Sequence, residues 1–263
     1  MTDNTDKKSG LEPYLRSRLK EKDILLMTHA VVGYPSLEEN WAMLECMAEA
    51  SVDLVELQLP FSEPIADGPA FIKANQLALE HNIHWNDYFD FFQKASDAFD
   101  FPLLFMGYYN SVFTMGEETF CDRLKTAGGD GYIIADLPME ASIELDKKGK
   151  QHKLDHIQIM TPVNSDERMQ KISDHASGFL YCVARKGVTG KQTSFDETLT
   201  EYIQRCRKAS NLPLALGFGI KSAEQVNALK TKADIAIIGT ACLEVWEQQG
   251  KAKYIEFLTT LRK

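Results

Sequence analysis

The sequence predicts an α/β fold, a single (β/α)8 TIM barrel with an extra N-terminal helix. Short apolar runs alternate with longer amphipathic segments along the chain, the apolar runs number eight, and glycines gather just after the last three. Strands that alternate with helices form parallel β-α-β units, and eight such units close into a barrel. In that fold the active site lies at the carboxyl ends of the strands.

The eight predicted strands are short and rich in Ile, Leu and Val, as buried parallel strands are. They are Ile24–Val32, Asp53–Leu59, Pro102–Tyr108, Gly131–Ala135, His156–Met160, Gly178–Val183, Pro213–Leu216 and Ala233–Ile238. An open, doubly wound sheet is the alternative. It is less favoured because no Gly-x-Gly-x-x-Gly follows the first run.

Helix-length segments separate the runs. The first follows Ser36, which forms a Ser-x-x-Glu capping box with Glu39. The others are Pro69–Glu80, Trp85–Phe99, Glu117–Ala127, Ala141–Gly149, Ser165–Ser173, Asp196–Ala209, Ser222–Lys230 and Cys242–Leu261. No linker or low-complexity tract divides them, so residues 1–263 are predicted to form one domain, with residues 1–10 as a flexible tail.

Composition excludes several classes of function. The 29 basic and 38 acidic residues give a net charge of −9, which argues against nucleic acid or an anionic membrane as partner. No apolar run approaches the roughly 20 residues that span a bilayer, and the polar start MTDNTDKKSGLEPYL lacks the apolar core of a signal peptide. Five scattered cysteines are typical of reduced thiols rather than disulfides or a zinc site. We therefore expect a cytoplasmic protein without a metal.

Two acidic residues bracket the end of the second predicted strand. Glu56 lies between Val55 and Leu57 and shares one strand face with Gln58, by the period of two. If that face is the lumen, Glu56 meets the substrate from a low-dielectric wall, which suits a general acid/base. The alternative is a paired structural glutamate. Asp67 follows in a turn-rich loop, where aspartate is also common for local reasons. Together they form a candidate proton-handling pair.

Three glycine segments follow the last three strands. They are Arg185–Gly190, Gly217–Ile220 and Gly239–Thr240, the last of which opens the final helix. Glycine lets the backbone approach an anion closely, and helix N-termini offer free N–H groups. Each segment alone is weak, but together they predict a phosphate site where barrels commonly have one. The connections Pro60–Gly68 and Ala184–Phe195 are the longest strand-to-helix loops and the candidates for a lid.

Five histidines show no metal-ligand spacing, and we interpret them as surface or helix-end residues. They are His81, His84, His152, His156 and His175.

The ordered set of strand-end residues resembles the tryptophan synthase alpha subunit family, from about Lys20 to Leu261. The resemblance is carried by Val55–Pro69 (VELQLPFSEPIADGP), Asn75, Gln76, Gly33, Pro35, Asn110, Ala135–Pro138, Pro162, Asn164, Gly178–Tyr181, Arg185, Gly187–Gly190, Gly217–Ile220 and Gly239–Thr240.

The resemblance implies retro-aldol cleavage of indole-3-glycerol phosphate to indole and glyceraldehyde 3-phosphate. It implies that Glu56 is the acid/base, that Asp67 stabilises charge on the indole nitrogen, and that Tyr181 lies beside Glu56. It also implies that Thr189 meets Asp67 when the loop closes and that Phe218 forms a wall of the indole pocket. The phosphate would be held by Gly190, Gly219, Gly239 and Thr240.

The same resemblance implies the partners. The family needs no cofactor in this subunit. It pairs with a pyridoxal-phosphate beta subunit as an α2β2 heterotetramer, and indole passes to that subunit through a tunnel. The loop Pro60–Asp67 and the segments that begin helices at the catalytic face would meet that subunit.

The sequence departs from the family pattern near the site. The family usually has glycine where this chain has Gln58, which could crowd the substrate or hydrogen-bond Glu56. His29 replaces an aromatic residue, Glu63 an aspartate and Tyr34 an aspartate. Gly107 replaces a bulkier residue and could give back room that Gln58 takes.

The departures near Glu56 keep two further hypotheses open. One is a weakly catalytic chain that binds and activates the beta subunit. The other is a related phosphate-binding barrel enzyme that acts on another sugar phosphate. Retained Glu56, Asp67 and Tyr181 favour the lyase.

Overall fold

The computed structural model describes residues 10–184 and 197–262 and contains one parallel sheet with the strand order β5-β4-β3-β2-β1-β9-β8-β7-β6. The strands are β1 (Leu25–Val31), β2 (Leu54–Gln58), β3 (Leu103–Gly107), β4 (Gly131–Ile134), β5 (Asp155–His156), β6 (Gln158–Met160), β7 (Leu180–Val183), β8 (Leu214–Gly217) and β9 (Ile235–Ile238). Because only Ile157 separates β5 from β6, the two ends of the sheet meet in one strand. The predicted eight-stranded barrel is confirmed, with its fifth strand divided in two.

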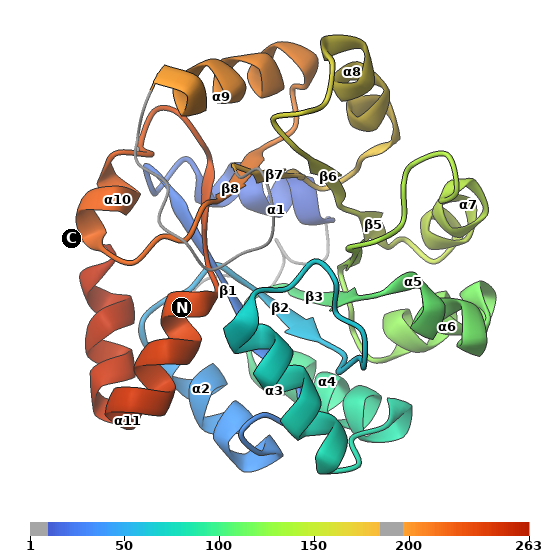
Figure 1. The fold of residues 1–263 in the computed structure, drawn as a ribbon, viewed down its shortest axis with the longest axis vertical. Coiled ribbons are helices and arrows are strands. Elements are labelled where there is room, and N and C mark those ends of the chain that lie inside the picture. Colours follow the sequence, from blue (N-terminus) through green and yellow to red (C-terminus); the bar gives the residue numbers. More distant parts are fainter. Residues whose placement is uncertain (1–9, 185–196, 263) are drawn as a thin grey trace.

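Helices other than α1 surround the strands in a ring (Figure 1). The described helices are α1 (Leu11–Arg18), α2 (Leu37–Glu49), α3 (Pro69–Glu80), α4 (Trp85–Ala98), α5 (Tyr109–Met115), α6 (Glu117–Thr126), α7 (Ile143–Gln151), α8 (Asp166–His175), α9 (Glu197–Ala209), α10 (Ala223–Asn227) and α11 (Thr240–Thr260). The expected cap of α2 is present, because the Ser36 hydroxyl accepts from the Glu39 N–H at 3.2 Å. A kink at Gly250, where φ is +74°, divides α11.

Alternation along each strand divides the core into two clusters. Leu25 and Met27 of β1 and Leu54 of β2 belong to the lumen cluster. Leu26, Val55 and Leu57 belong to the larger cluster between barrel and helices. Since successive side chains point to opposite faces, Glu56 and Gln58 face the lumen together with Leu54.

Helix α1 closes the amino-terminal end of the barrel. Its Leu11 and Leu15 are buried in the lumen cluster, and the Leu11 N–H donates to the Asp155 carboxylate at 3.3 Å. Figure 1 shows α1 crossing the centre of the ring. The expected extra N-terminal helix therefore fills the bottom of the lumen and leaves the carboxyl end for a site.

Helix α5 is an element that the sequence did not predict. Its N-cap, Tyr108, makes no side-chain cap. Instead the first helical N–H, that of Tyr109, donates to Asp136 Oδ1 at 2.7 Å, from the segment after β4. Because this capping residue lies 27 positions away, no local pattern indicates where the helix begins.

Two sequence interpretations are wrong. His156 is not a surface residue: it is buried, pairs with Asp146 and stacks on Tyr132 with ring centroids 4.6 Å apart. Gly107 gives no room back to Gln58. A Cβ at Gly107 would lie 2.6 Å from the Phe105 ring, which packs in the cluster outside the barrel, whereas Gln58 faces the lumen.

Candidate active site

Glu56 lies in the lumen wall and is fully buried. Neither of its carboxylate oxygens has a hydrogen-bond partner among the described residues. Burying a carboxylate without donors is costly, so such groups in native proteins call for an explanation, and a catalytic role is one. The second strand thus places an unsatisfied acid/base group inside the barrel.

Among the described residues, His29 is the titratable side chain that pairs with Glu56. The parallel register of β1 and β2 places His29 directly beside Glu56. Its Nδ1 lies 3.4 Å from Glu56 Oε1, which is close enough for an ion pair but does not form a hydrogen bond. Burial alone would lower the pKa of His29, but the carboxylates of Glu56 and Asp67 outweigh it and raise that pKa above its usual value.

Gln58 joins His29 to Asp67. Its Oε1 is 2.7 Å from His29 Nε2, and its Nε2 donates to Asp67 Oδ2 at 2.7 Å. Burial raises the pKa of Asp67, while the positive charge of His29 and the donor on Gln58 oppose that rise. Of the two possibilities considered for Gln58, a hydrogen bond to Glu56 is not formed, and Gln58 instead contacts His29, which lies beside Glu56.

The loop that carries Asp67 is tied to the barrel by two residues whose roles the sequence did not assign. Asn75 of α3 donates to Asp67 Oδ2 at 3.3 Å and accepts from the Phe61 N–H at 2.9 Å. Tyr108 accepts from the Ala66 N–H at 3.1 Å and stacks on Phe61, with ring centroids 5.0 Å apart. The sequence offered one indication of the role of Tyr108: it carries a hydroxyl group directly after β3, where site residues are expected.

Tyr181 of β7 faces the same lumen. It packs against the lumen cluster, and burial raises its pKa well above the usual value, with the negative charges of Glu56 and Asp67 adding to the effect. A Cβ at Gly217 of β8 would lie 3.6 Å from the Tyr181 hydroxyl. The small residue on the neighbouring strand thus leaves space beside the ring.

The predicted phosphate segments after β8 and β9 lie at the same end of the barrel. Gly219 has φ +81°, a conformation that L side chains rarely adopt. Gly239 caps the 21-residue α11, and Thr240 is its first residue. The first N–H groups of a helix have no partner within it and favour an anion.

Some expected site residues lie outside the barrel lumen or outside the described residues. Phe218 is buried in the cluster between barrel and helices, so its expected contact with indole stays a prediction. Thr189 and Gly190 lie outside the described residues, as do Arg185 and Gly187. Within residues 10–184 and 197–262, no group of three or more His, Cys, Asp or Glu could hold a metal ion.

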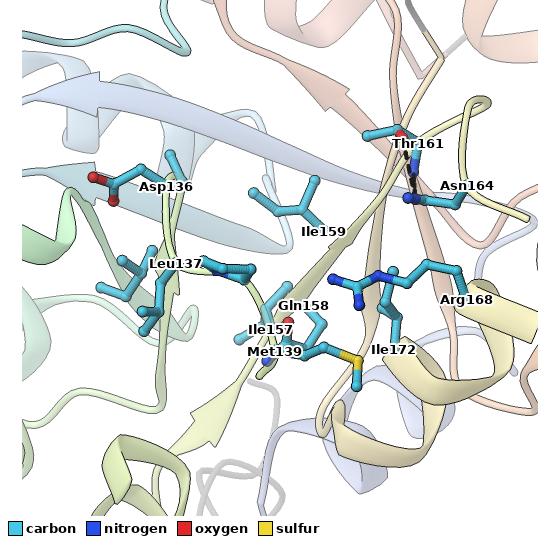
Figure 2. A pocket seen from close by; sticks show the side chains of 13 residues that line it. Asp136, Leu137, Met139, Ile157, Gln158, Ile159, Thr161, Asn164, Arg168 and Ile172 are labelled. Carbon is cyan, nitrogen blue, oxygen red and sulfur yellow. Dashed lines mark hydrogen bonds between the residues drawn. The ribbon is translucent and has the colours of Figure 1, made fainter. Parts of the chain in front are cut away.

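A cavity of 270 Å³ opens at the carboxyl ends of β4 and β6, and the sequence did not predict it. Ile134, Ile157 and Ile159 give it apolar walls, and Asp136 and Arg168 lie on its rim (Figure 2). Arg168 also pairs with Glu140. The cavity therefore lies on the same face of the barrel as Glu56.

These features define a class of protein: a (β/α)8 barrel with buried carboxylates in its lumen and, at the same end, the N-terminus of a long helix. Comparison with known proteins then gives the family. The family model for the tryptophan synthase alpha chain matches residues 15–261. The chain belongs to the tryptophan synthase alpha chain family, which makes it a lyase of tryptophan biosynthesis.

Individual relatives agree. The tryptophan synthase alpha chain of Syntrophotalea carbinolica is 46% identical over 252 residues, which are 96% of this chain and 100% of the relative. That of Desulforapulum autotrophicum is 46% identical over 95% of this chain and 99% of the relative. Both support the predicted family.

Solved structures agree as well. A Mycobacterium tuberculosis tryptophan synthase structure matches with a TM-score of 0.89 and 26% identity, covering 96% of each chain. The Legionella pneumophila tryptophan synthase alpha chain matches with a TM-score of 0.84 and 28% identity, covering 96% of this chain and 95% of that one. The family, fold and enzyme class predicted from the sequence are confirmed.

Proposed function

We propose that this chain cleaves indole-3-glycerol phosphate to indole and glyceraldehyde 3-phosphate, with Glu56 as acid/base. The observation that carries the proposal is the pair of buried Glu56 oxygens without a hydrogen-bond donor among the described residues. Glu56 would protonate the indole carbon as the carbon–carbon bond breaks and would accept the proton of the glycerol hydroxyl. The proton count is then unchanged over the cycle.

Asp67 and the strand-end glycines would support that chemistry. Asp67 accepts from Gln58 and Asn75 on Oδ2, and its carboxylate would accept the indole N–H as positive charge develops there. Gly219, Gly239 and Thr240, together with Gly190, would bind the phosphate through backbone amides. Tyr181 would line the indole side, and Thr189 and Phe218 would complete the pocket. These groups require no cofactor in this chain.

We propose one domain that works in the cytoplasm. All five cysteines are free and buried, as reduced thiols would be. None of the helices in the described part of the chain is long and apolar enough to cross a membrane. A single sheet contains every described strand.

A partner surface at the catalytic face is supported by exposed apolar side chains. Ile65, Phe113, Ile143 and Val163 are 71%, 66%, 58% and 72% exposed. Each lies after a strand and before or near the start of a helix, so all four share the carboxyl end of the barrel, and Glu63 beside them is exposed too. Exposed apolar patches mark interfaces. We assign this surface to a pyridoxal-phosphate beta subunit in an α2β2 assembly.

The activity test is release of indole from indole-3-glycerol phosphate by the purified chain, with and without the beta subunit. The proposal expects release in both cases. No release even with a competent beta subunit would reject it.

The partner test compares Phe113→Glu and Val163→Glu with a control variant, Gln151→Glu. Gln151 is exposed at the C-terminal end of α7, away from the face that carries the four apolar side chains. The first two changes should weaken beta binding by about tenfold or more, because they put charge into an apolar contact. Equal binding by all three variants would remove this face as the docking surface.

A further inference from the structure

His29 occupies a defined place between the two carboxylates of the site. Its ring lies beside Glu56 through the β1–β2 register, and Gln58 stands one lumen layer above. The contacts form an unbroken chain: Glu56 Oε1 to His29 Nδ1 at 3.4 Å, His29 Nε2 to Gln58 Oε1 at 2.7 Å, and Gln58 Nε2 to Asp67 Oδ2 at 2.7 Å. All four side chains are buried.

Asp67 fixes the direction of this chain. Asp67 Oδ2 receives amide donors from both Gln58 and Asn75, so it acts as an acceptor. The amide nitrogen of Gln58 therefore faces Asp67, and its carbonyl oxygen faces His29. An oxygen acceptor at 2.7 Å requires His29 Nε2 to carry a hydrogen. In the neutral ring, Nδ1 then has a free lone pair directed at Glu56.

The surroundings of His29 favour a proton on Nδ1. The charged groups that face it are the carboxylates of Glu56 and Asp67. Two described neighbours from other elements carry no charge: Phe71 of α3, with its ring centroid 4.4 Å away, and Gly239, whose Cβ position would lie 3.7 Å from the His29 Cβ. Two anions beside one buried imidazole stabilise its protonated form.

We propose that His29, held in one tautomer by Gln58, is a positioning residue that shares a proton with Glu56 and couples the protonation of Glu56 to that of Asp67. The inference rests on the proposed lyase function and deepens it. As Glu56 gives its proton to the indole carbon, the Nδ1–H of His29 stabilises the carboxylate that forms. When Glu56 takes the hydroxyl proton, that support is released and His29 is unchanged.

The kinetic test compares His29→Phe, Gln58→Ala and the double variant with the wild type in indole release. Phe keeps a ring of similar size and removes both nitrogens, and Ala removes the amide. His29→Phe should lower kcat on the order of tenfold to a hundredfold and change KM little, because the two ring nitrogens that it removes contact Glu56 and Gln58 and not the proposed phosphate segments. It should also move the pH dependence of kcat.

The double variant separates coupling from packing. Each single change leaves a buried group unpaired, whereas the double change removes both partners, so the loss in the double variant should be smaller than the product of the two single losses. A loss of kcat in the double variant that equals the product of the two single losses, together with an unaltered pH profile, would overturn the inference. That result is expected of two independent packing defects.

A second readout does not depend on activity. Ring ¹⁵N shifts of His29, assigned with His29→Phe, should show the Nε2–H tautomer in the wild type and a pKa that falls in Glu56→Gln. Gln58→Ala should give mixed tautomers. An Nδ1–H tautomer in the wild type, or a pKa unmoved by Glu56→Gln, would reject the inference even in an active enzyme. Absence of indole release by the wild type would instead reject the lyase proposal and leave the ¹⁵N result to decide this one.

Discussion

Two buried acidic residues of the β2 segment, three positions apart, differ in the hydrogen-bond donors around their carboxylates. Asp53, just before the strand, is buried and surrounded by donors: Leu26 N–H at 2.9 Å, Arg262 at 2.7 Å, Lys22 at 2.5 Å and Arg18 at 3.5 Å. Glu56, inside the strand, is equally buried and has no hydrogen-bond donor among the described residues. A satisfied carboxylate holds structure together, whereas an unsatisfied one is retained for chemistry.

The two ends of the barrel differ accordingly. At the amino-terminal end, Asp53 connects the end of α1 and the segment after it, the start of β1 and the last described residue, Arg262, so three distant parts of the chain meet in one network. At the carboxyl end, the network from Glu56 to Asp67 joins β1, β2, the following loop and the adjacent helix α3. The first network should therefore govern stability, and the second activity.

The largest expected effect on stability comes from Asp53→Ala. Removing one partner leaves three cations and the Leu26 N–H without their shared acceptor, which should cost about 3 kcal/mol in the free energy of unfolding. Urea unfolding measures that loss. The fraction that remains folded should release indole with nearly the wild-type kcat, and a kcat that falls while stability holds would reverse the assignment of the two ends.

Gly219→Ala should act more weakly and on both properties. The left-handed conformation at φ +81° is strained for alanine, so we expect a loss of about 1 kcal/mol in unfolding free energy. Because Gly219 lies in a proposed phosphate segment, KM should rise as well. Gly250→Ala, at φ +74° with open space around it, is the matched control. It should lose similar stability with unchanged KM, and a rise in KM for both variants would remove Gly219 from the phosphate site.

The smallest effect is a pH dependence of stability that comes from His29 and Asp67 at the carboxyl end. Folding raises the pKa of His29 above 6.5 and that of Asp67 above 3.8. A raised folded pKa means that the stability contributed is full below the unfolded pKa and is lost as pH rises through the folded one. For His29 that window begins near pH 6.5.

Unfolding free energies of the wild type and His29→Phe, measured from about pH 6 to about pH 9, test this sign. The wild type should lose stability relative to the variant as pH rises. A difference that grows in the opposite direction would show that burial, and not the two carboxylates, controls His29.

The sequence predicted the elements whose signals are local. Eight apolar runs defined the strands, and the alternation in β2 placed Glu56 and Gln58 on one face. It could not predict α5, because its first N–H is held by Asp136 from another loop. It also assigned His156 to the surface, since nothing near it in sequence indicates a partner in Asp146.

For the site, the sequence named the acidic pair but not its connections. The expected link from Gln58 to Glu56 runs through His29, because the β1–β2 register, which is a tertiary property, sets those neighbours. The roles of Asn75 and Tyr108 likewise depend on where the β2–α3 loop folds back. The sequence also suggested that Gly107 makes room for Gln58. The structure shows that Gly107 packs against the Phe105 ring outside the lumen, a contact that only the folded chain reveals.

The most direct test of the role of Glu56 is kcat for indole release by Glu56→Gln, measured beside the unfolding free energy of the same variant. The substituted amide keeps the shape of the side chain and removes both the negative charge and the acid/base function. We expect kcat to fall on the order of 10²- to 10⁴-fold while stability changes little, because the loss of the interaction with His29 is offset by the removal of an unsatisfied buried carboxylate. Near wild-type kcat together with a large loss of stability would contradict this assignment, since Glu56 would then be a structural residue like Asp53.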